Sequence, residues 1–433
     1  MKIFGDDGFR DITFKGLMDK KFLNDFFIAI NFFLKEKNIK SKIFIGYDTR
    51  NTNKQIIELI TTNIKIVKNI KIFKIPVTTP YCHFISQKEK TFVIMITASH
   101  FRYNYNGFKF FLNGSKLNFK DERLIINNLQ NKNVPILRKN NTKVTKNFLN
   151  DYQNYINNNF NLKINKNVLF DYSNGAAASF INKINFLKKC NKINFKYNGR
   201  NINLNCGSEY LHKNINLFTK KNHLAFAFDG DADRVLIGKK NYGIIETEKI
   251  ALIFAIYLKQ KYKNFKKFSE NKTIIGTIIT NPWLKKQLSE EGFGLKLSRV
   301  GDRNVINKIK KNKALFGFET SGHFSFNNTM DGIFTAGMFL RVLRENPSLI
   351  DEILKKEIDY KKLIFVIKKT NLKRVVKKLL FLKKNLKIKV IVRKSIWSKD
   401  HKIYIFYKKS LKKILMKKIY NKVILKNVEK MIK

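Results

Sequence analysis

Three aspartates at alternate positions are the strongest chemical signal in the chain. Asp229, Asp231 and Asp233 stand in the run Asp-Gly-Asp-Ala-Asp-Arg, between two apolar stretches. Three carboxylates this close repel one another unless a cation lies among them, and such oxygen ligands suit Mg²⁺ or Ca²⁺. An EF-hand is excluded, because its sixth and twelfth positions are here Arg234 and Lys240. The pattern predicts a hard-cation site; the alternative is a solvated acidic turn.

A serine and a histidine follow a second apolar stretch. Residues 92–96 are Phe-Val-Ile-Met-Ile, and the chain continues Thr-Ala-Ser-His, so Ser99 and His100 come directly after a predicted strand. In open α/β sheets this edge commonly carries functional groups, and we expect Ser99 to be exposed there. Lys109 follows ten residues later, in Asn-Gly-Phe-Lys. An ordinary polar turn is the alternative interpretation.

A third apolar stretch, 314–318, leads into Glu-Thr-Ser-Gly-His. Glu319 and Ser321 could exchange hydrogen bonds with hydroxyl groups, and His323 could transfer a proton near neutral pH. Alone, this histidine could equally be structural. The three stretches share one plan, in which an apolar strand leads into a polar loop. Three α/β units of this kind would bring their loops together in one cleft.

The elements that must position these loops alternate along the chain. Apolar spacing predicts helices over 21–34, 55–67 and 246–258, and strands over 42–47, 70–75, 168–172, 224–228 and 274–279. This alternation indicates mixed, largely parallel sheets with crossover connections. Near the end, apolar and basic residues alternate over 386–392 and 402–407, which predicts two strands of a small α+β unit.

Composition limits the partners. The 433 residues carry a formal net charge of +55, which suggests a nucleic-acid binder. The lysines are scattered through every segment, however, so we expect no specific nucleic-acid partner and only weak binding at low salt. Three cysteines without a C-x-x-C pair indicate neither a disulfide framework nor structural zinc. No apolar run approaches the ~20 residues that span a bilayer, and no signal peptide is evident; we expect a cytoplasmic protein without a membrane partner.

Taken in their order along the chain, these motifs resemble those of the α-D-phosphohexomutases. The run 97–100 is similar to the family's phosphoserine loop, although the usual His-Asn-Pro is here His-Phe-Arg, and we expect the missing proline to loosen the turn. The aspartate run is similar to the family's magnesium loop, and 319–323 to its sugar-binding loop. Residues 4–10 resemble its opening Phe-Gly-Thr-Asp-Gly-x-Arg, with Asp6 in place of threonine.

The resemblance covers nearly the whole chain and implies a fold. It implies three mixed-sheet α/β domains and a smaller C-terminal α+β domain around a central active-site cleft. We expect these domains to span residues 1–147, 148–245, 246–357 and 358–433.

The resemblance also implies a site. Ser99 would carry a phosphoryl group, and one Mg²⁺ would be bound by Ser99 and the three aspartates. The implied catalytic residues are Ser99, Arg10, His100, Lys109, Arg234 and His323, and the implied substrate-binding residues are Arg303, Glu319, Ser321, Arg393 and Ser395. Arg393 and Ser395 remain from the family's Arg-x-Ser-Gly-Thr-Glu-Pro phosphate loop. The other members of that loop are replaced, which we expect to weaken phosphate binding.

Two motifs indicate a branch of the family. Asn-x-x-Cys-Gly-Ser at 203–208 and Val-Gly-Asp-Arg at 300–303 resemble the phosphoglucosamine mutases. The implied reaction interconverts glucosamine 6-phosphate and glucosamine 1-phosphate through a 1,6-bisphosphate, which also activates the enzyme, for UDP-N-acetylglucosamine and cell-wall precursor synthesis. The expected partner is thus a small sugar phosphate, and we expect a monomer or homodimer. The alternatives are a phosphomannomutase or phosphoglucomutase, and a decayed, basic nucleic-acid-binding or scaffold protein.

Overall fold

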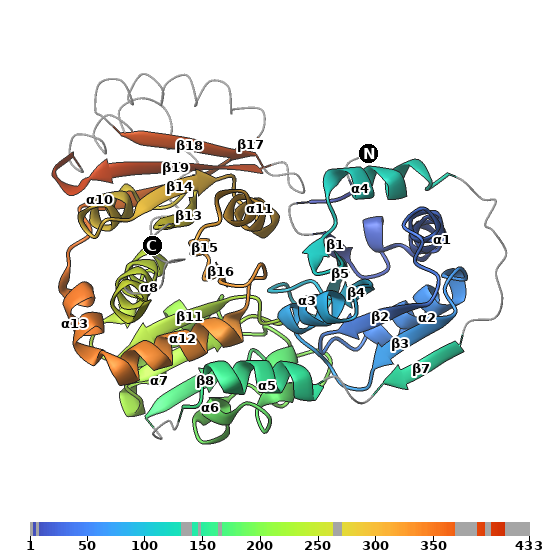
Figure 1. Cartoon of the computed structure of the whole chain (residues 1–433), viewed down its shortest axis with the longest axis horizontal. Helices are drawn as coiled ribbons and strands as arrows, with labels where there is room; N and C mark the ends of the chain where they lie inside the picture. Colours follow the sequence, from blue (N-terminus) through green and yellow to red (C-terminus); the bar gives the residue numbers. More distant parts are fainter. Residues whose placement is uncertain are drawn as a thin grey trace.

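The computed structural model describes residues 3–5, 8–130, 141–145, 149–162, 167–262, 271–368, 388–394 and 400–411 (Figure 1). Within these ranges the strands form four sheets, of seven, five, four and three strands. Short 3₁₀ turns occur at Gly16–Met18, Ala176–Phe180 and Lys409–Leu411. Among the described residues, no helix combines the length and the hydropathy needed to cross a bilayer.

The first sheet is mixed. Its order is β1 (Phe9–Ile12), β5 (Tyr105–Leu112), β4 (Phe92–Ile96), β2 (Lys42–Tyr47), β3 (Asn69–Phe73) and β7 (Asn141–Thr145), with β6 (Ser115–Lys116) paired to β5. Strands β4, β2, β3 and β7 run parallel, whereas β5 is antiparallel to β4 and β1. Its helices are α1 (Lys20–Glu36), α2 (Asn53–Asn63), α3 (Thr79–Lys88) and α4 (Phe119–Asn127).

Strand β4 shows why this sheet is covered on both faces. Successive side chains of a strand point to opposite faces, and all five residues of β4 are buried. Phe92, Ile94 and Ile96 pack in one core cluster with residues of α1 and α2. Val93 and Met95 pack in the other, with residues of α3. That second cluster continues into the neighbouring units, so α3 lies at the junction between them.

The second sheet carries the aspartate run in its central hairpin. Its order is β12 (Gly243–Ile244), β11 (Val235–Lys239), β10 (Leu224–Phe228), β8 (Val168–Asp171) and β9 (Asn191–Ile193), and its helices are α5 (Leu149–Asn159), α6 (Asn185–Lys188) and α7 (Leu211–Lys221). Strands β8 and β10 are parallel, and β10 pairs antiparallel with β11. The run 229–234 is therefore a hairpin turn, held between two buried strands.

The third sheet carries the Glu-x-Ser-Gly-His loop between its last two strands. Its order is β14 (Gly294–Ser298), β13 (Thr273–Thr277), β15 (Phe316–Phe318) and β16 (Phe324–Ser325). The surrounding helices are α8 (Thr247–Tyr262), α10 (Pro282–Glu290), α11 (Asp302–Asn312), α12 (Gly332–Glu345) and α13 (Pro347–Lys355).

The fourth sheet is small and antiparallel, in the order β17 (Tyr360–Lys368), β19 (Asp400–Lys408), β18 (Lys389–Lys394). It lies over the third unit, beside α10 and β14 (Figure 1). Tyr404 and Phe406 of β19 pack on Ile279, and Asn281 Nδ2 donates to the carbonyl of Tyr360 at 3.0 Å. The predicted fold class, three mixed α/β units and a smaller fourth one, is confirmed. The predicted domain boundaries fall between the sheets and stay predictions, as does the central cleft.

Candidate active site

Ser99 lies in the loop that follows β4. Its backbone is left-handed, with φ 52°, and its N–H donates to Thr97 Oγ1 at 2.8 Å. Its Oγ donates to Asp229 Oδ2 at 2.7 Å, which joins the first unit to the second. The prediction that Ser99 is exposed is wrong: it is only 2% exposed, because the loops of the second unit cover the edge of the first sheet.

Buried donors hold the Ser99 turn without the family's proline. Asn203 Nδ2 donates to the carbonyls of Ser99 and Phe101, at 2.8 and 2.9 Å. Arg50 Nη2 donates to the same two oxygens, at 3.3 and 2.5 Å. The guanidinium of Arg10 lies 4.7 Å from the centre of the Phe101 ring, and its Nη1 donates to Ala98 at 3.5 Å. Two units thus fix the conformation of this loop.

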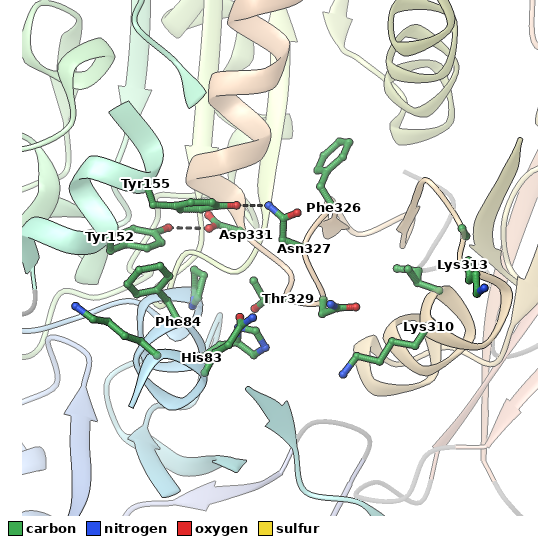
Figure 2. Close-up of a pocket in the computed structure, with 16 residues that line it drawn as sticks. His83, Phe84, Tyr152, Tyr155, Lys310, Lys313, Phe326, Asn327, Thr329 and Asp331 are labelled. Atoms are coloured by element: carbon green, nitrogen blue, oxygen red, sulfur yellow. Dashed lines mark hydrogen bonds between the residues drawn. The ribbon is translucent and has the colours of Figure 1, made fainter. Parts of the chain in front are cut away.

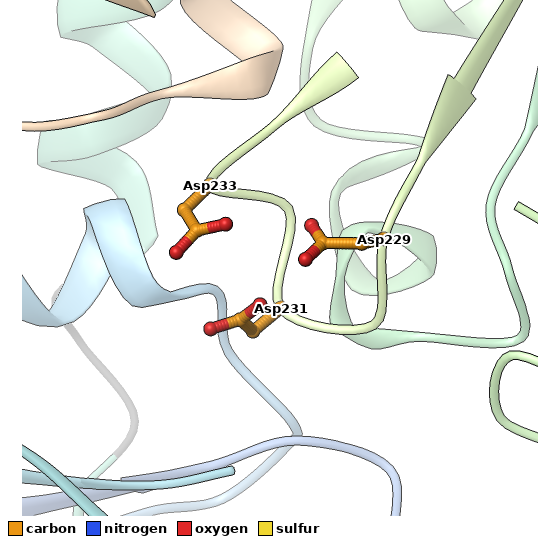
Figure 3. A group of neighbouring side chains, drawn as sticks. All are labelled: Asp229, Asp231 and Asp233. Atoms are coloured by element: carbon orange, nitrogen blue, oxygen red, sulfur yellow. The ribbon is translucent and has the colours of Figure 1, made fainter. Parts of the chain in front are cut away.

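The three aspartates form a compact cluster in the hairpin turn. One carboxylate oxygen of each lies within 4.8 Å of the others, and Figure 3 shows the three side chains turned toward one another. All three residues are at most 1% exposed. Asp229 Oδ1 and Asp231 Oδ1 have no hydrogen-bond partner within the described part of the chain. Since an unpartnered buried carboxylate oxygen is costly, this donor set fits a hard cation.

The neighbouring charges act unequally on the three carboxylates. Burial, with Asp233 and Asp231 close by, raises the pKa of Asp229 to about 8. Burial would also raise the pKa of Asp233, but Lys109 and His323 hold it well below its ordinary value. Lys109 Nζ lies 2.8 Å from Asp231 Oδ2 and 2.5 Å from Asp233 Oδ2. Protein cations thus neutralise one side of the cluster, and a metal ion would favour ionisation of the other.

Arg234 connects the cluster to the histidine beside the serine. Its Nε lies 3.2 Å from Asp229 Oδ2, and its Nη2 lies 2.8 Å from His100 Nδ1. Burial, and then the charges of Arg234 and Arg10, lower the pKa of His100 well below its ordinary value. His100 is therefore neutral, and its Nδ1 accepts the hydrogen bond from Arg234. That nitrogen lies 3.4 Å from Ser99 Oγ.

The third loop reaches the cluster through His323. Its Nε2 lies 3.0 Å from Asp233 Oδ1, and its Nδ1 lies 2.8 Å from Ser321 Oγ. Burial lowers the pKa of His323, but Asp233 outweighs burial and raises it overall. Glu319 Oε1 accepts from the N–H of Gly301 at 2.7 Å. The expectation that the loops at Ser99, Asp229 and Glu319 meet is therefore confirmed.

Arg303 is not brought into this cluster, and two further predicted site residues cannot be placed from the described part of the chain. Arg303 Nη2 donates to Glu122 Oε1 at 2.6 Å and to the carbonyl of Gly5 at 3.3 Å, at the junction of the first and third units. Arg393 lies on β18, but its side chain is outside the described part of the chain. Ser395 lies outside the described residues altogether.

Sequence reasoning missed two residues that hold the site. Thr79 Oγ1 donates to Asp231 Oδ2 at 2.5 Å, and the Thr79 N–H donates to the Asp231 carbonyl at 3.0 Å. The only local signal is a helix start at Thr-Thr-Pro, where Pro80 occupies the first turn. Asn203 was noticed only as part of a branch motif, and its contacts with the Ser99 loop could not be read from that motif.

A separate pocket of about 920 Å³ opens between α3, α5, α11 and the loop that follows β16 (Figure 2). Phe84, Tyr155, Lys310 and Asn327 are among the residues that line it, and none of the predicted site residues that the structure describes does. Among the lining residues, Asp331 Oδ2 accepts from the hydroxyl of Tyr152 at 2.7 Å.

Comparison with known proteins identifies the family. Two models match, the phosphoglucomutase/phosphomannomutase α/β/α domain I over residues 1–134 and domain III over residues 246–360. The phosphoglucosamine mutase of Dictyoglomus thermophilum is 31% identical over 82% of this chain and 79% of its own. The chain belongs to the phosphohexomutase family. The phosphoglucosamine mutase of Campylobacter jejuni strain RM1221 is another relative of this phosphohexomutase, 29% identical over 85% of each chain.

Solved structures show the same fold. A phosphoglucomutase/phosphomannomutase family protein of Burkholderia thailandensis superimposes on this phosphohexomutase with a TM-score of 0.77, at 17% identity over 97% of both chains. The Paramecium phosphoglucomutase parafusin gives a TM-score of 0.79, at 15% identity over 96% of this chain and 94% of that one. An Aspergillus fumigatus N-acetylphosphoglucosamine mutase, solved with glucose 1,6-bisphosphate, gives 0.64 at 11% identity, over 97% of this chain and 95% of that one. Phosphohexomutases are isomerases, and this one is most similar to those named phosphoglucosamine mutase.

Proposed function

We propose that this phosphohexomutase interconverts glucosamine 6-phosphate and glucosamine 1-phosphate by passing a phosphoryl group through Ser99. The observation that carries the proposal is the 2.7 Å contact between Ser99 Oγ and Asp229, beside two carboxylate oxygens that lack a partner among the described residues. A nucleophile next to a cation-binding cluster is the arrangement that phosphoryl transfer requires. Relatives that carry the name phosphoglucosamine mutase support the choice of sugar.

The proposed cofactor is one Mg²⁺, held by Asp229, Asp231 and Asp233 and, once it is phosphorylated, by Ser99. Bound there, it would neutralise charge on the phosphoryl oxygens. The ligand set fits because two of the carboxylate oxygens are buried and unpartnered within the described residues.

The protein groups supply the remaining charge and positioning. In the first step the bond between phosphorus and Ser99 Oγ breaks, and a bond forms to the free hydroxyl of the sugar phosphate, which becomes a bisphosphate. The opposite transfer then returns the other phosphoryl group to Ser99. Arg234 and Lys109 contact the aspartates of the cluster and Arg10 contacts the serine loop, so all three would neutralise the equatorial oxygens. His100 accepts the hydrogen bond that orients Arg234.

Lys109 or His323 would transfer the proton. Both groups lie against Asp233, and one of them would accept the proton of the attacking sugar hydroxyl and pass it to Ser99 Oγ as the bond to phosphorus breaks. The sugar hydroxyl gives up its proton in one transfer, and Ser99 regains one when it is left unphosphorylated. Glu319 and Ser321 would bind the sugar hydroxyls, because they lie beside His323 on the same loop.

The non-reacting phosphate is assigned to the fourth unit, through Arg393 and Ser395, with Arg303 as a further candidate. This unit must accept either end of the sugar, so we expect it to move during turnover.

The test is turnover by the purified protein with Mg²⁺ and a trace of hexose 1,6-bisphosphate. Glucosamine 6-phosphate is offered in parallel with the glucose and mannose analogues, and Ser99→Ala is the control. We expect glucosamine 1-phosphate from the wild type and none from the variant. Turnover of glucose or mannose phosphate alone would instead indicate a phosphoglucomutase or phosphomannomutase. No turnover of any sugar, with Ser99 unphosphorylated, would contradict the enzyme proposal.

A further inference from the structure

Helix α3 begins at the aspartate cluster, although it belongs to a different unit. Thr78 caps the helix, since its Oγ1 accepts from the N–H of Tyr81 at 3.3 Å, and Pro80 stands in the first turn. Thr79, the first helical residue, is 2% exposed. Its place in the first turn leaves its N–H outside the helical hydrogen-bond pattern and free to bond to the hairpin turn of the second unit.

Thr79 makes two hydrogen bonds to one residue of that turn. Its N–H donates to the Asp231 carbonyl at 3.0 Å, and its Oγ1 donates to Asp231 Oδ2 at 2.5 Å. Lys109 Nζ lies 2.8 Å from the same Oδ2. Asp231 Oδ1 has no partner among the described residues. Thr79 and Lys109, both of the first unit, therefore fix Oδ2 of this carboxylate, whereas Oδ1 remains available within the aspartate cluster.

We propose that Thr79 is a positioning residue for the metal site, which holds Asp231 so that Oδ1 is presented to the divalent cation. This inference rests on the metal site of the proposed function, but not on the identity of the sugar. Residues that orient a metal ligand typically change metal affinity by about 10- to 100-fold when they are removed. Without the Thr79 hydroxyl, Asp231 Oδ2 keeps Lys109 alone, and the carboxylate can rotate about its side-chain torsions.

The experiment compares three single variants with the wild type. Thr79→Val keeps the shape of the side chain but removes the hydroxyl, and Thr79→Ser restores it. Thr78→Val is the matched control, because it removes the hydrogen bond that caps the same helix without touching Asp231. Mg²⁺ affinity is measured by calorimetric titration of the metal-free protein, and the thermal unfolding midpoint of each variant is recorded with and without Mg²⁺.

We expect Thr79→Val to weaken Mg²⁺ binding by about 10- to 100-fold, and Thr79→Ser to bind close to the wild-type value. Thr78→Val should lower the unfolding midpoint yet keep its Mg²⁺ affinity. Wild-type affinity in Thr79→Val overturns the inference, and so does an equal loss in Thr78→Val, which would mean that the helix acts only as scaffold.

The same titration separates this inference from the proposed function. A wild type that binds Mg²⁺ but turns over no sugar phosphate contradicts the proposed function alone, and the role of Thr79 is still decided by the affinities of the variants. A wild type that binds no divalent cation overturns both.

Discussion

Asn203 shows how much one side chain contributes to the geometry of the nucleophile. Its amide bonds to the carbonyls of Ser99 and Phe101 across two units, while its own backbone is left-handed, with φ 55°. Asn203→Gly removes the amide and tolerates that backbone. We expect kcat, and the rate at which bisphosphate phosphorylates Ser99, to fall by roughly tenfold or more with little change in KM, because small misplacements of reacting groups are costly.

The control for Asn203 lies two residues away. Asn205 also has a left-handed backbone, with φ 54°, but its side chain is exposed. Asn205→Gly should therefore keep near-wild-type kcat. Equal losses in the two glycine variants would show that the loop needs only its asparagine backbone conformations, not the contact with Ser99.

Asp331 makes stability depend on pH. Burial raises its pKa to about 6, although hydrogen bonds from Phe334 and Tyr152 oppose the shift. The folded state thus binds this proton more tightly than the unfolded chain does. The stabilisation is complete below about pH 4 and is lost as the pH rises through about 6. At about 1.4 kcal/mol per pH unit, the wild type should lose roughly 3 kcal/mol relative to Asp331→Asn over that range.

The measurement is urea unfolding of both proteins at several pH values between 4 and 7. The difference between the two free energies of unfolding matters, because the other titrating groups cancel in it. Parallel curves would mean that Asp331 titrates alike in the folded and unfolded states.

At the scale of elements, the start of α12 also supports the aspartate hairpin. The Gly332 N–H donates to the Ala232 carbonyl at 3.0 Å. A Cβ on Gly332 would lie 2.5 Å from the Arg234 carbonyl oxygen, closer than any real contact. Gly332→Ala must therefore displace the hairpin, and we expect it to weaken Mg²⁺ binding and to cost about 1–3 kcal/mol of stability.

Gly294→Ala is the matched control for this change. A Cβ there would meet nothing nearer than Thr273 Oγ1, at 4.0 Å. Denaturant unfolding and Mg²⁺ titration of both variants check the prediction. If Gly332→Ala behaves like Gly294→Ala, the contact between α12 and the hairpin has no influence on the site.

The strands could be predicted better than the contacts between units. Strands 42–47, 92–96 and 224–228 were predicted with the bounds observed, because each is a buried apolar run that ends at polar residues. The predicted helix 55–67 instead ends at Asn63, since Ile64 is already extended. The spacing of residues near Ser99 could not predict its burial, because the residue that packs over it belongs to a loop more than a hundred positions away in the sequence.

The site divides in the same way into features that the sequence could predict and contacts that it could not. The three loops could be predicted to meet, because each follows a strand of its own sheet. Thr79 and Asp231 are 152 positions apart, however, and nothing in the local sequence of either indicates the other. Arg303 illustrates the opposite case: its motif is similar to the family's, yet its guanidinium bonds to Glu122 rather than to the cluster.

At the scale of the whole molecule, buried ion pairs join the first and third units. Arg303 and Glu122 are paired at 2.6 Å, with side chains 7% and 8% exposed. Lys116 pairs with Asp302 next to them, and Lys310 Nζ donates to Ser115 Oγ at 2.9 Å. If Arg303 mainly holds the two units together, then Glu122 matters as much as the arginine itself.

Removing one partner from a buried pair leaves an uncompensated charge, which typically costs about 3–5 kcal/mol. We therefore expect Glu122→Gln and Arg303→Gln each to lower stability by an amount of that order, and the double variant to lose less than both losses combined. Denaturant unfolding of the four proteins measures this coupling, and KM for the sugar phosphate is determined alongside. A direct role for Arg303 in substrate binding gives a different pattern in KM: Arg303→Gln raises it, whereas Glu122→Gln does not. These measurements thus decide whether Arg303 binds the sugar phosphate or holds the first and third units together.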